Sequence, residues 1–198
     1  MQLEANMKFL TLGLLSLSMS VHAANLNLSS DNSKLEWEGK KVSGAHQGLV
    51  TLKSGKIEVG AENELTGGEI VVDLTSITVT DLQGEWADKL VGHLKSDDFF
   101  SVDKHPTAVF KIESVKKVKG NTYKVSGPLT IKGKSEKQSF DVTVKAGDDK
   151  VTVTGDIKVD RTAYGVKYGS GKFFDPKTLG DKMIDDKFSI KLNLVANK

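Results

Sequence analysis

Histidine is the residue type best suited to acid–base or metal chemistry near neutral pH, and this chain has four of them. His22 lies in an N-terminal segment that we expect to be removed, and His46, His93 and His105 are widely spaced in the sequence. No HExxH, GxSxG or glycine-rich phosphate-loop motif surrounds them. A three-histidine site would have to be assembled by the fold, and nothing in the spacing predicts one.

The carboxylates and the overall composition give no better sign of catalysis. The neighbours in Asp97-Asp98, Asp148-Asp149 and Asp185-Asp186 do not converge on one atom, and none has EF-hand spacing, so we interpret them as turn and strand-edge residues. The absence of cysteine excludes disulfides, thiol chemistry and a lipid-modified cysteine. A net charge of +2, with acids and bases mixed, carries no signature of nucleic-acid binding. The sequence favours a binding protein over an enzyme, without a cofactor or metal.

The chemistry that the sequence does offer is apolar surface, arranged with the period of β-strands. Apolar and polar residues alternate over residues 35–38, 70–74, 108–113, 123–126, 129–132, 140–145, 151–154, 157–160 and 188–194. Turn residues separate these runs at 53–56, 66–68, 119–121, 132–134 and 146–149. About eight strands with short turns predict an antiparallel barrel or sandwich. Pro128 lies inside one run and predicts a bulge or an edge, because proline cannot donate to the ladder.

Two segments depart from this alternation. Over residues 85–95 the apolar side chains recur every four positions, which predicts a helix of about three turns with one apolar face made by Trp86, Leu90 and Leu94. Phe99 and Phe100 follow this helix and could cap or line one mouth of a barrel. Residues 164–183 are rich in glycine and predict a long irregular loop between the last two strands. The helix and the loop are candidate lids.

The N-terminus has the features of a secretory signal peptide. Lys8 precedes an apolar run over residues 9–21, and Val21-His22-Ala23 supplies small or aliphatic residues for cleavage. The run is too short and too rich in serine for a membrane-spanning helix. We therefore predict a signal peptide over residues 1–23, cleaved after Ala23, and one domain over residues 24–198 in the periplasm or secreted. Met7 would give the cleaner start of such a signal.

Several motifs resemble the YceI-like family. The central signature is His93–Lys111, which reads HLKSDDFFSVDKHPTAVFK, and the others are GPLTIKG at Gly127–Gly133 and DRTAYGV at Asp160–Val166. Residues 37–48 resemble a variant of the N-terminal strand pair. Ser101 stands where the family usually has Asp, Pro128 at a usually non-proline position, and a single His46 where two histidines are more usual.

This resemblance implies an eight-stranded antiparallel barrel, similar to lipocalins, that binds polyisoprenoid chains such as prenylated quinones or their precursors. The residues that match the family motifs directly are Phe99, Phe100, Phe110, Leu129, Ile131 and Tyr164. Trp37, from the variant strand pair, and further residues chosen by alternation or helical spacing complete the predicted ligand site, namely Ile70, Val72, Leu74, Leu90, Leu94, Ile112, Phe188 and Ile190. His46 and Tyr164 are candidates to bond a head group, although structural hydrogen bonding is the simpler interpretation of each.

The predicted function is therefore to bind, and to carry or store, a polyisoprenoid lipid, with transient membrane contact and a homodimer left open. Two other classes remain open at this stage. A packed, ligand-free interaction or stress-protection module would have a filled barrel. An enzyme would need the histidines, or a histidine and a carboxylate, to converge. The interior volume of the barrel is the cheapest observation that distinguishes the lipid carrier, the packed module and the enzyme.

Overall fold

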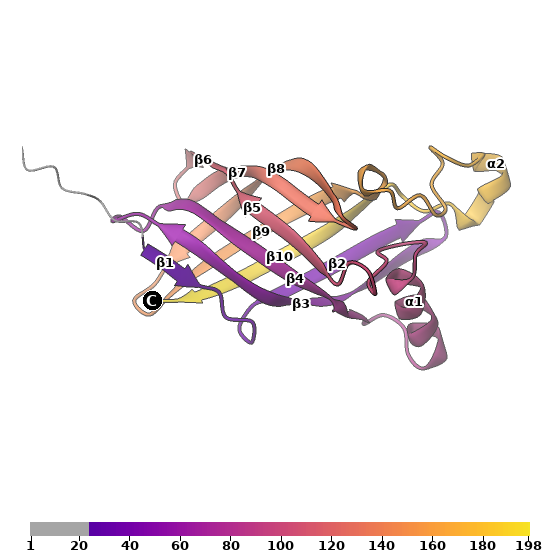
Figure 1. The fold of residues 1–198 in the computed structure, drawn as a ribbon, viewed down its shortest axis with the longest axis horizontal. Helices are drawn as coiled ribbons and strands as arrows, with labels where there is room; N and C mark the ends of the chain where they lie inside the picture. Colours follow the sequence, from indigo (N-terminus) through magenta and orange to yellow (C-terminus); the bar gives the residue numbers. More distant parts are fainter. Residues whose placement is uncertain (1–23) are drawn as a thin grey trace, which may run out of the picture.

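A computed structural model describes residues 24–198 of the chain, so the predicted signal peptide and its cleavage lie outside the described residues. Ten antiparallel strands form one sheet that closes into an elongated barrel (Figure 1). The strands are β1 (Ala24–Asn27), β2 (Lys34–Lys41), β3 (Gly44–Val59), β4 (Leu65–Val79), β5 (Thr107–Ile112), β6 (Ser114–Lys119), β7 (Thr122–Ile131), β8 (Lys134–Ala146), β9 (Lys150–Asp160) and β10 (Lys187–Asn197). The helices are α1 (Glu85–Lys95), α2 (Pro176–Leu179) and the 3₁₀ turns η1 (Arg161–Tyr164) and η2 (Gly180–Lys182).

The ten strands occupy eight positions around the barrel. The order β3-β2-β10-β9-β8-β7-β5-β4 closes because β4 pairs back onto β3. β1 extends the position of β2, since it pairs with β3 while Leu28 bridges to Ala196 of β10. β6 likewise extends the position of β5 along β7. The predicted all-β fold, an eight-stranded antiparallel barrel with a short helix and a long irregular loop, is confirmed.

Two of the predicted turns are wrong, and both lie within the paired region of β3 and β4. Residues 53–56 are inside β3 and residues 66–68 are at the start of β4. A Cβ on Gly55 would lie 2.8 Å from the Glu69 carbonyl oxygen, and one on Gly68 would lie 2.6 Å from that of Lys56. Gly68 also has φ of 151°. These glycines therefore permit close strand contact in a strongly curved pair, and do not reverse the chain.

Pro128 lies where the neighbour of β7 changes. Leu129 pairs with Phe110 of β5, and Ser126 pairs with Ser114 of β6, so residues 127–128 fall between the two registers. A Cβ on Gly127 would lie 1.9 Å from the Lys111 carbonyl oxygen, which shows how closely the chains approach here. The predicted interruption at Pro128 is confirmed on one side of β7, where pairing changes from β5 to β6. Pairing with β8 on the other side continues through Pro128.

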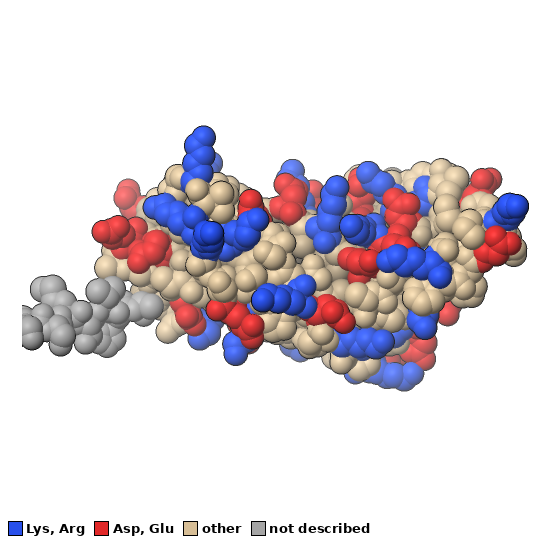
Figure 2. All heavy atoms as spheres, turned by 90° about the horizontal axis from the view of Figure 1, so that it is seen from above, with Lys and Arg blue, Asp and Glu red and all other residues tan. Residues whose placement is uncertain are grey.

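The two ends of the barrel differ. The end at β1 is filled by buried side chains, among them Leu28, Val59, Tyr123, Val151 and Ala196. The opposite end carries α1 together with the segment 161–186, and Figure 1 shows α1 and α2 at the end away from the C-terminus. Along the wall between them, acidic and basic side chains are interspersed over most of the face drawn in Figure 2. The barrel is therefore closed at one end and covered by irregular structure at the other.

Candidate ligand cavity

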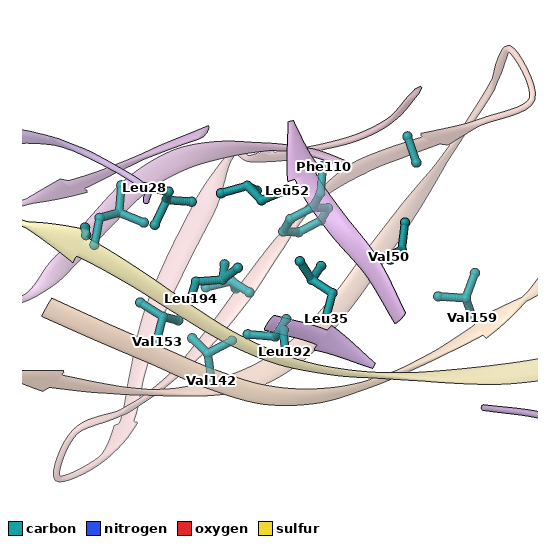
Figure 3. Packing of buried hydrophobic residues seen from close by; sticks show 14 of the residues in the cluster. Leu28, Leu35, Val50, Leu52, Phe110, Val142, Val153, Val159, Leu192 and Leu194 are labelled. Carbon is teal, nitrogen blue, oxygen red and sulfur yellow. The ribbon is translucent and has the colours of Figure 1, made fainter. Parts of the chain in front are cut away.

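An apolar cavity occupies the barrel interior and extends toward the end that carries α1. The volume of this cavity is about 200 Å³. Arg161 and Asp185 are the charged residues among those that line it. Figure 3 shows apolar side chains from facing strands, such as Leu35, Phe110 and Leu192, directed into the same interior.

Thirteen of the fifteen residues predicted to bind ligand line this cavity. They are Trp37, Ile70, Val72, Leu74, Leu94, Phe99, Phe100, Phe110, Ile112, Leu129, Ile131, Phe188 and Ile190. The strand residues among them are brought together by the period-two rule, because alternate side chains of every barrel strand point inward. A ligand inside the cavity would contact these thirteen side chains, and their role in ligand binding stays a prediction.

Leu90 and Tyr164 do not line the cavity, unlike the other thirteen residues, and their role in ligand binding stays a prediction. α1 contributes only Leu94, from its last turn, to the lining, while Leu90 is half-buried and Trp86 is 70% exposed. The helix therefore reaches the interior with its C-terminal turn, and the face predicted from four-residue spacing is not buried along its length. Tyr164, the last residue of η1, is fully buried, and its hydroxyl accepts a hydrogen bond from Gln138 Nε2 at 3.1 Å.

Eighteen lining residues were not in the predicted set. Most are apolar strand residues that the same alternation could have supplied, namely Leu35, Val50, Ile57, Leu65, Ile77, Ala108, Val125, Phe140, Val142, Val153, Ile157, Val159, Leu192 and Leu194. The remaining four are Gly39, Arg161, Ile184 and Asp185, which lie at the end that carries α1. The alternation of apolar and polar residues does not predict these four. Arg161, Ile184 and Asp185 reach the cavity because of how the loop between β9 and β10 is folded.

Trp37 joins the lining from β2 and has its polar edge satisfied. The indole Nε1 donates to the Thr78 carbonyl oxygen at 3.1 Å. A Cβ on Gly48 would lie 2.8 Å from Trp37 Cε2 and 1.8 Å from the Thr78 oxygen. Gly48 thus leaves the space in which the indole contacts β4.

Aromatic side chains link α1 to the loop across the end of the cavity. The His93 ring meets the rings of Phe99 at 4.8 Å and Tyr168 at 4.6 Å, both edge-on. Phe100 meets Phe188 of β10 at 6.0 Å. Ser101 follows with φ of 49°, a left-handed conformation that is uncommon for residues other than glycine and in which Asp and Asn are enriched.

Arg161 organises the loop between β9 and β10. Its buried guanidinium donates to four backbone carbonyls, those of Val166 (3.0 Å), Tyr168 (2.8 Å), Ile184 (3.0 Å) and Asp185 (2.9 Å). Burial lowers the pKa of Arg161, and the nearby carboxylates, Asp186 first, oppose this. Arginine remains protonated in proteins, so it holds both branches of the loop as a charged donor.

A second set of charges ties the same loop to the end of β9. Lys172 Nζ lies 2.8 Å from Asp160 and 3.6 Å from Asp186. Partial burial would raise the pKa of Asp160, but hydrogen bonds from Lys172 and Thr162 lower it to about 2. Ser170 Oγ, fully buried, donates to Asp186 Oδ1 at 2.5 Å. The long loop predicted from the glycines is therefore firmly held.

Two of the histidines, His46 and His93, are each paired with a carboxylate. His46 Nδ1 lies 2.7 Å from Asp81, and His93 Nε2 lies 3.2 Å from Asp98, but neither histidine lines the cavity. Burial by itself would raise the pKa of Asp81, but hydrogen bonds with the Gln47 amide and His46 lower it below its ordinary value. Within residues 24–198, no group of three His, Asp or Glu side chains is placed to hold a metal ion.

Comparison with known proteins agrees with this geometry. Residues 26–196 match the model of the YceI-like domain family. The chain belongs to the YceI-like family. No curated protein matches the sequence. Over the part of this YceI-like chain that the structure describes, no helix is both long and apolar enough to cross a membrane.

Solved structures show the same barrel. The chain is similar to BcnA of Burkholderia cenocepacia, with 24% identity, a TM-score of 0.69, and coverage of 85% of this chain and 99% of that one. It is similar to a polyisoprenoid binding domain from Saccharophagus degradans, implicated in plant cell wall breakdown, with 13% identity, a TM-score of 0.62, and coverage of 89% and 99%. For the Campylobacter jejuni YceI protein the values are 20%, 0.52, 68% and 74%. At these identities the likeness establishes the fold.

Proposed function

We propose that this YceI-like barrel binds the tail of a polyisoprenoid lipid in its interior cavity and carries or stores it in the periplasm. The observation that supports this most is the lining, which is apolar along its whole length and has its two charged residues near one end. A packed interaction module would have a filled interior. The polyisoprenoid binding domain of Saccharophagus degradans shares the fold, which supports the same class of ligand here.

The size of the cavity indicates how such a ligand fits. An apolar cavity of ~150 Å³ stays dry and takes up benzene, whereas drug-sized ligands occupy ~300–1,000 Å³. The space of about 200 Å³ therefore admits a narrow apolar group, and a longer chain requires side chains to turn aside. Phe110 and Phe140, whose rings pack at 5.0 Å, both line the cavity and are bulky side chains of the barrel wall that a tail could displace.

The energetics predict a dependence on chain length. Burial contributes ~0.8 kcal/mol for each CH₂ group, so one five-carbon isoprene unit contributes about 4 kcal/mol before costs. Association itself costs ~4–15 kcal/mol in lost freedom and ordering. One unit therefore barely binds, and affinity rises steeply over the next few units until the cavity is full.

A cavity-blocking variant with a matched control tests the proposal. Ala108 is buried and lines the cavity from β5, whereas the next residue, Val109, is half-buried and is not part of the lining. Ala108→Phe is expected to abolish quenching of Trp37 by added prenylquinones, and Val109→Phe to leave it unchanged. Circular dichroism checks that both variants fold. Equal quenching in the two variants would contradict the proposal.

Two further measurements address the natural ligand and the compartment. Protein purified from its native host should release a prenylated lipid on organic extraction, identified by mass spectrometry. Its N-terminal residue should be Ala24 if the signal is removed as predicted, and fractionation should place it in the periplasm. Recovery of no lipid, together with no quenching of Trp37, would argue against the carrier.

A further inference from the structure

Exposed aromatic side chains gather at the end of the barrel that carries α1. Six large apolar side chains are exposed within residues 24–198, and one of them, Val118 of β6, lies toward the opposite end. The other five lie in α1, in the turn between β2 and β3, and in the loop after β9, and they are Val42, Trp86, Tyr168, Phe173 and Phe174. Trp86 is 70% exposed and Phe174 51%, so folding leaves much of their apolar area in water.

These residues lie on segments that touch one another around the cavity opening. The amide of Val42 donates to the Met183 carbonyl at 3.0 Å, which joins the β2–β3 turn to the loop. Tyr168 meets His93 of α1 at 4.6 Å, which joins the loop to the helix. The lining residues Leu94 and Ile184 belong to the same segments. The exposed residues therefore lie on contacting segments at one end of the barrel, and we define them together as the docking surface, namely Val42, Trp86, Tyr168, Phe173 and Phe174.

Lysines accompany the apolar side chains of the docking surface. Lys89 Nζ lies 5.1 Å from the Trp86 ring centroid, and Lys167 Nζ lies 4.7 Å from that of Phe173. Lys41, beside Val42, and Lys167 form no ion pair with another described residue. Tryptophan and tyrosine with flanking lysines are typical of membrane–water interfaces, where the ring enters the headgroup region and the ammonium group meets lipid phosphates.

We infer that the docking surface binds the headgroup region of a bilayer that carries anionic lipids. Trp86, Phe173 and Phe174 would insert, while Lys41 and Lys167 contact phosphates; Lys89 is already paired with Glu85 at 3.1 Å. This orientation points the cavity opening at the membrane, so an apolar tail passes between bilayer and barrel without crossing water. The purpose of docking rests on the proposed function, but docking itself requires no ligand in the cavity.

Vesicle binding tests this inference separately from ligand binding. Purified protein is mixed with phosphatidylcholine vesicles, with and without phosphatidylglycerol and free of isoprenoids, and bound protein is measured by sedimentation. Wild-type protein is expected to sediment with the anionic vesicles. In a Trp37→Phe background, Trp86 emission is expected to shift to the blue. Replacing Trp86, Phe173 and Phe174 by alanine should weaken binding about tenfold or more, since apolar area and charge both contribute.

The controls separate the possible outcomes. Val118→Ala removes an exposed apolar side chain from the other end and should bind vesicles like the wild type. Ala108→Phe blocks the cavity and should also bind them, so loss of ligand binding and loss of docking are distinguishable. Wild-type protein that binds neither vesicle, as expected if the aromatics meet a protein partner, overturns the inference. So does a triple variant that binds as well as the wild type, and equal binding to both vesicles overturns the role of the lysines.

Discussion

Replacing Arg161 by methionine should destabilise the protein by about 3–5 kcal/mol, the range for removing one partner from a buried ionic arrangement. The guanidinium donates four hydrogen bonds to carbonyls on both branches of the loop. Bonds that involve a charged group contribute ~1.5–3 kcal/mol each, so four would give well over 5 kcal/mol if nothing opposed them.

Two opposing effects reduce this sum. The guanidinium is buried, and removing it recovers several kcal/mol of its desolvation cost, roughly the penalty for one buried ion. Three of the four bonds are only partly buried, so water can replace the donor to Tyr168, Ile184 and Asp185. The bond to the Val166 carbonyl is buried, and leaving that oxygen unpaired costs ~1–3 kcal/mol.

Urea unfolding at neutral pH measures the free energy of unfolding of both Arg161→Met and the control Arg161→Lys. Lysine keeps the charge but cannot span four carbonyls, so its loss should be about half that of methionine. Limited trypsin digestion should cut the methionine variant first within residues 165–186, because the loop loses its anchor. A methionine variant as stable as the wild type would refute the reasoning, since desolvation would then cancel the four bonds.

Three other predictions follow from the same structure. The pKa of Asp160 is lowered to about 2 from an ordinary 3.8, so its stabilisation is complete above the ordinary value and is lost as the pH falls toward 2. The stability difference between wild type and Asp160→Asn should shrink from pH 5 to pH 2 in urea titrations, and a constant difference would contradict this. Gly48→Ala should lower stability by about 1–3 kcal/mol or more, because its Cβ would lie 1.8 Å from the Thr78 oxygen, and a variant with wild-type Tm would argue against the packing described. Leu94→Ala should weaken prenylquinone binding measured by Trp37 quenching while Leu90→Ala should not, and the reverse order would mean that α1 meets the ligand along another face.

The strands and the apolar lining could be predicted because both depend on a local rule. Alternation assigns a side to each residue, so Ile70, Val72 and Leu74 fall inside whatever the neighbours of β4 are. Alternation gave no way to tell glycines that form turns from glycines that allow two paired strands to approach closely. Gly55 and Gly68 look like turn residues until the contact between β3 and β4 is known.

The covered end was harder to predict because its geometry is set by contacts between distant segments. Helical spacing predicts Trp86 on the same apolar face as Leu90 and Leu94, yet only the last turn of α1 contributes to the cavity lining, and Trp86 is exposed. Arg161 was noticed as part of a motif, but its acceptors are backbone carbonyls, which carry no sequence signal. The burial of Tyr164 in η1 was equally hard to predict, because its partner Gln138 lies far away in the sequence, in β8.

The filled end of the barrel has a consequence for how cargo is exchanged. Side chains such as Val151 and Ala196, which are 0% exposed, seal that end, so a chain cannot thread through the protein. Under the proposed function, a lipid tail would enter and leave by the same opening, with its last carbons deepest and its head group beside Arg161 and Asp185. Such a barrel would hold one lipid at a time, and release of that lipid through the single opening would limit the rate of exchange.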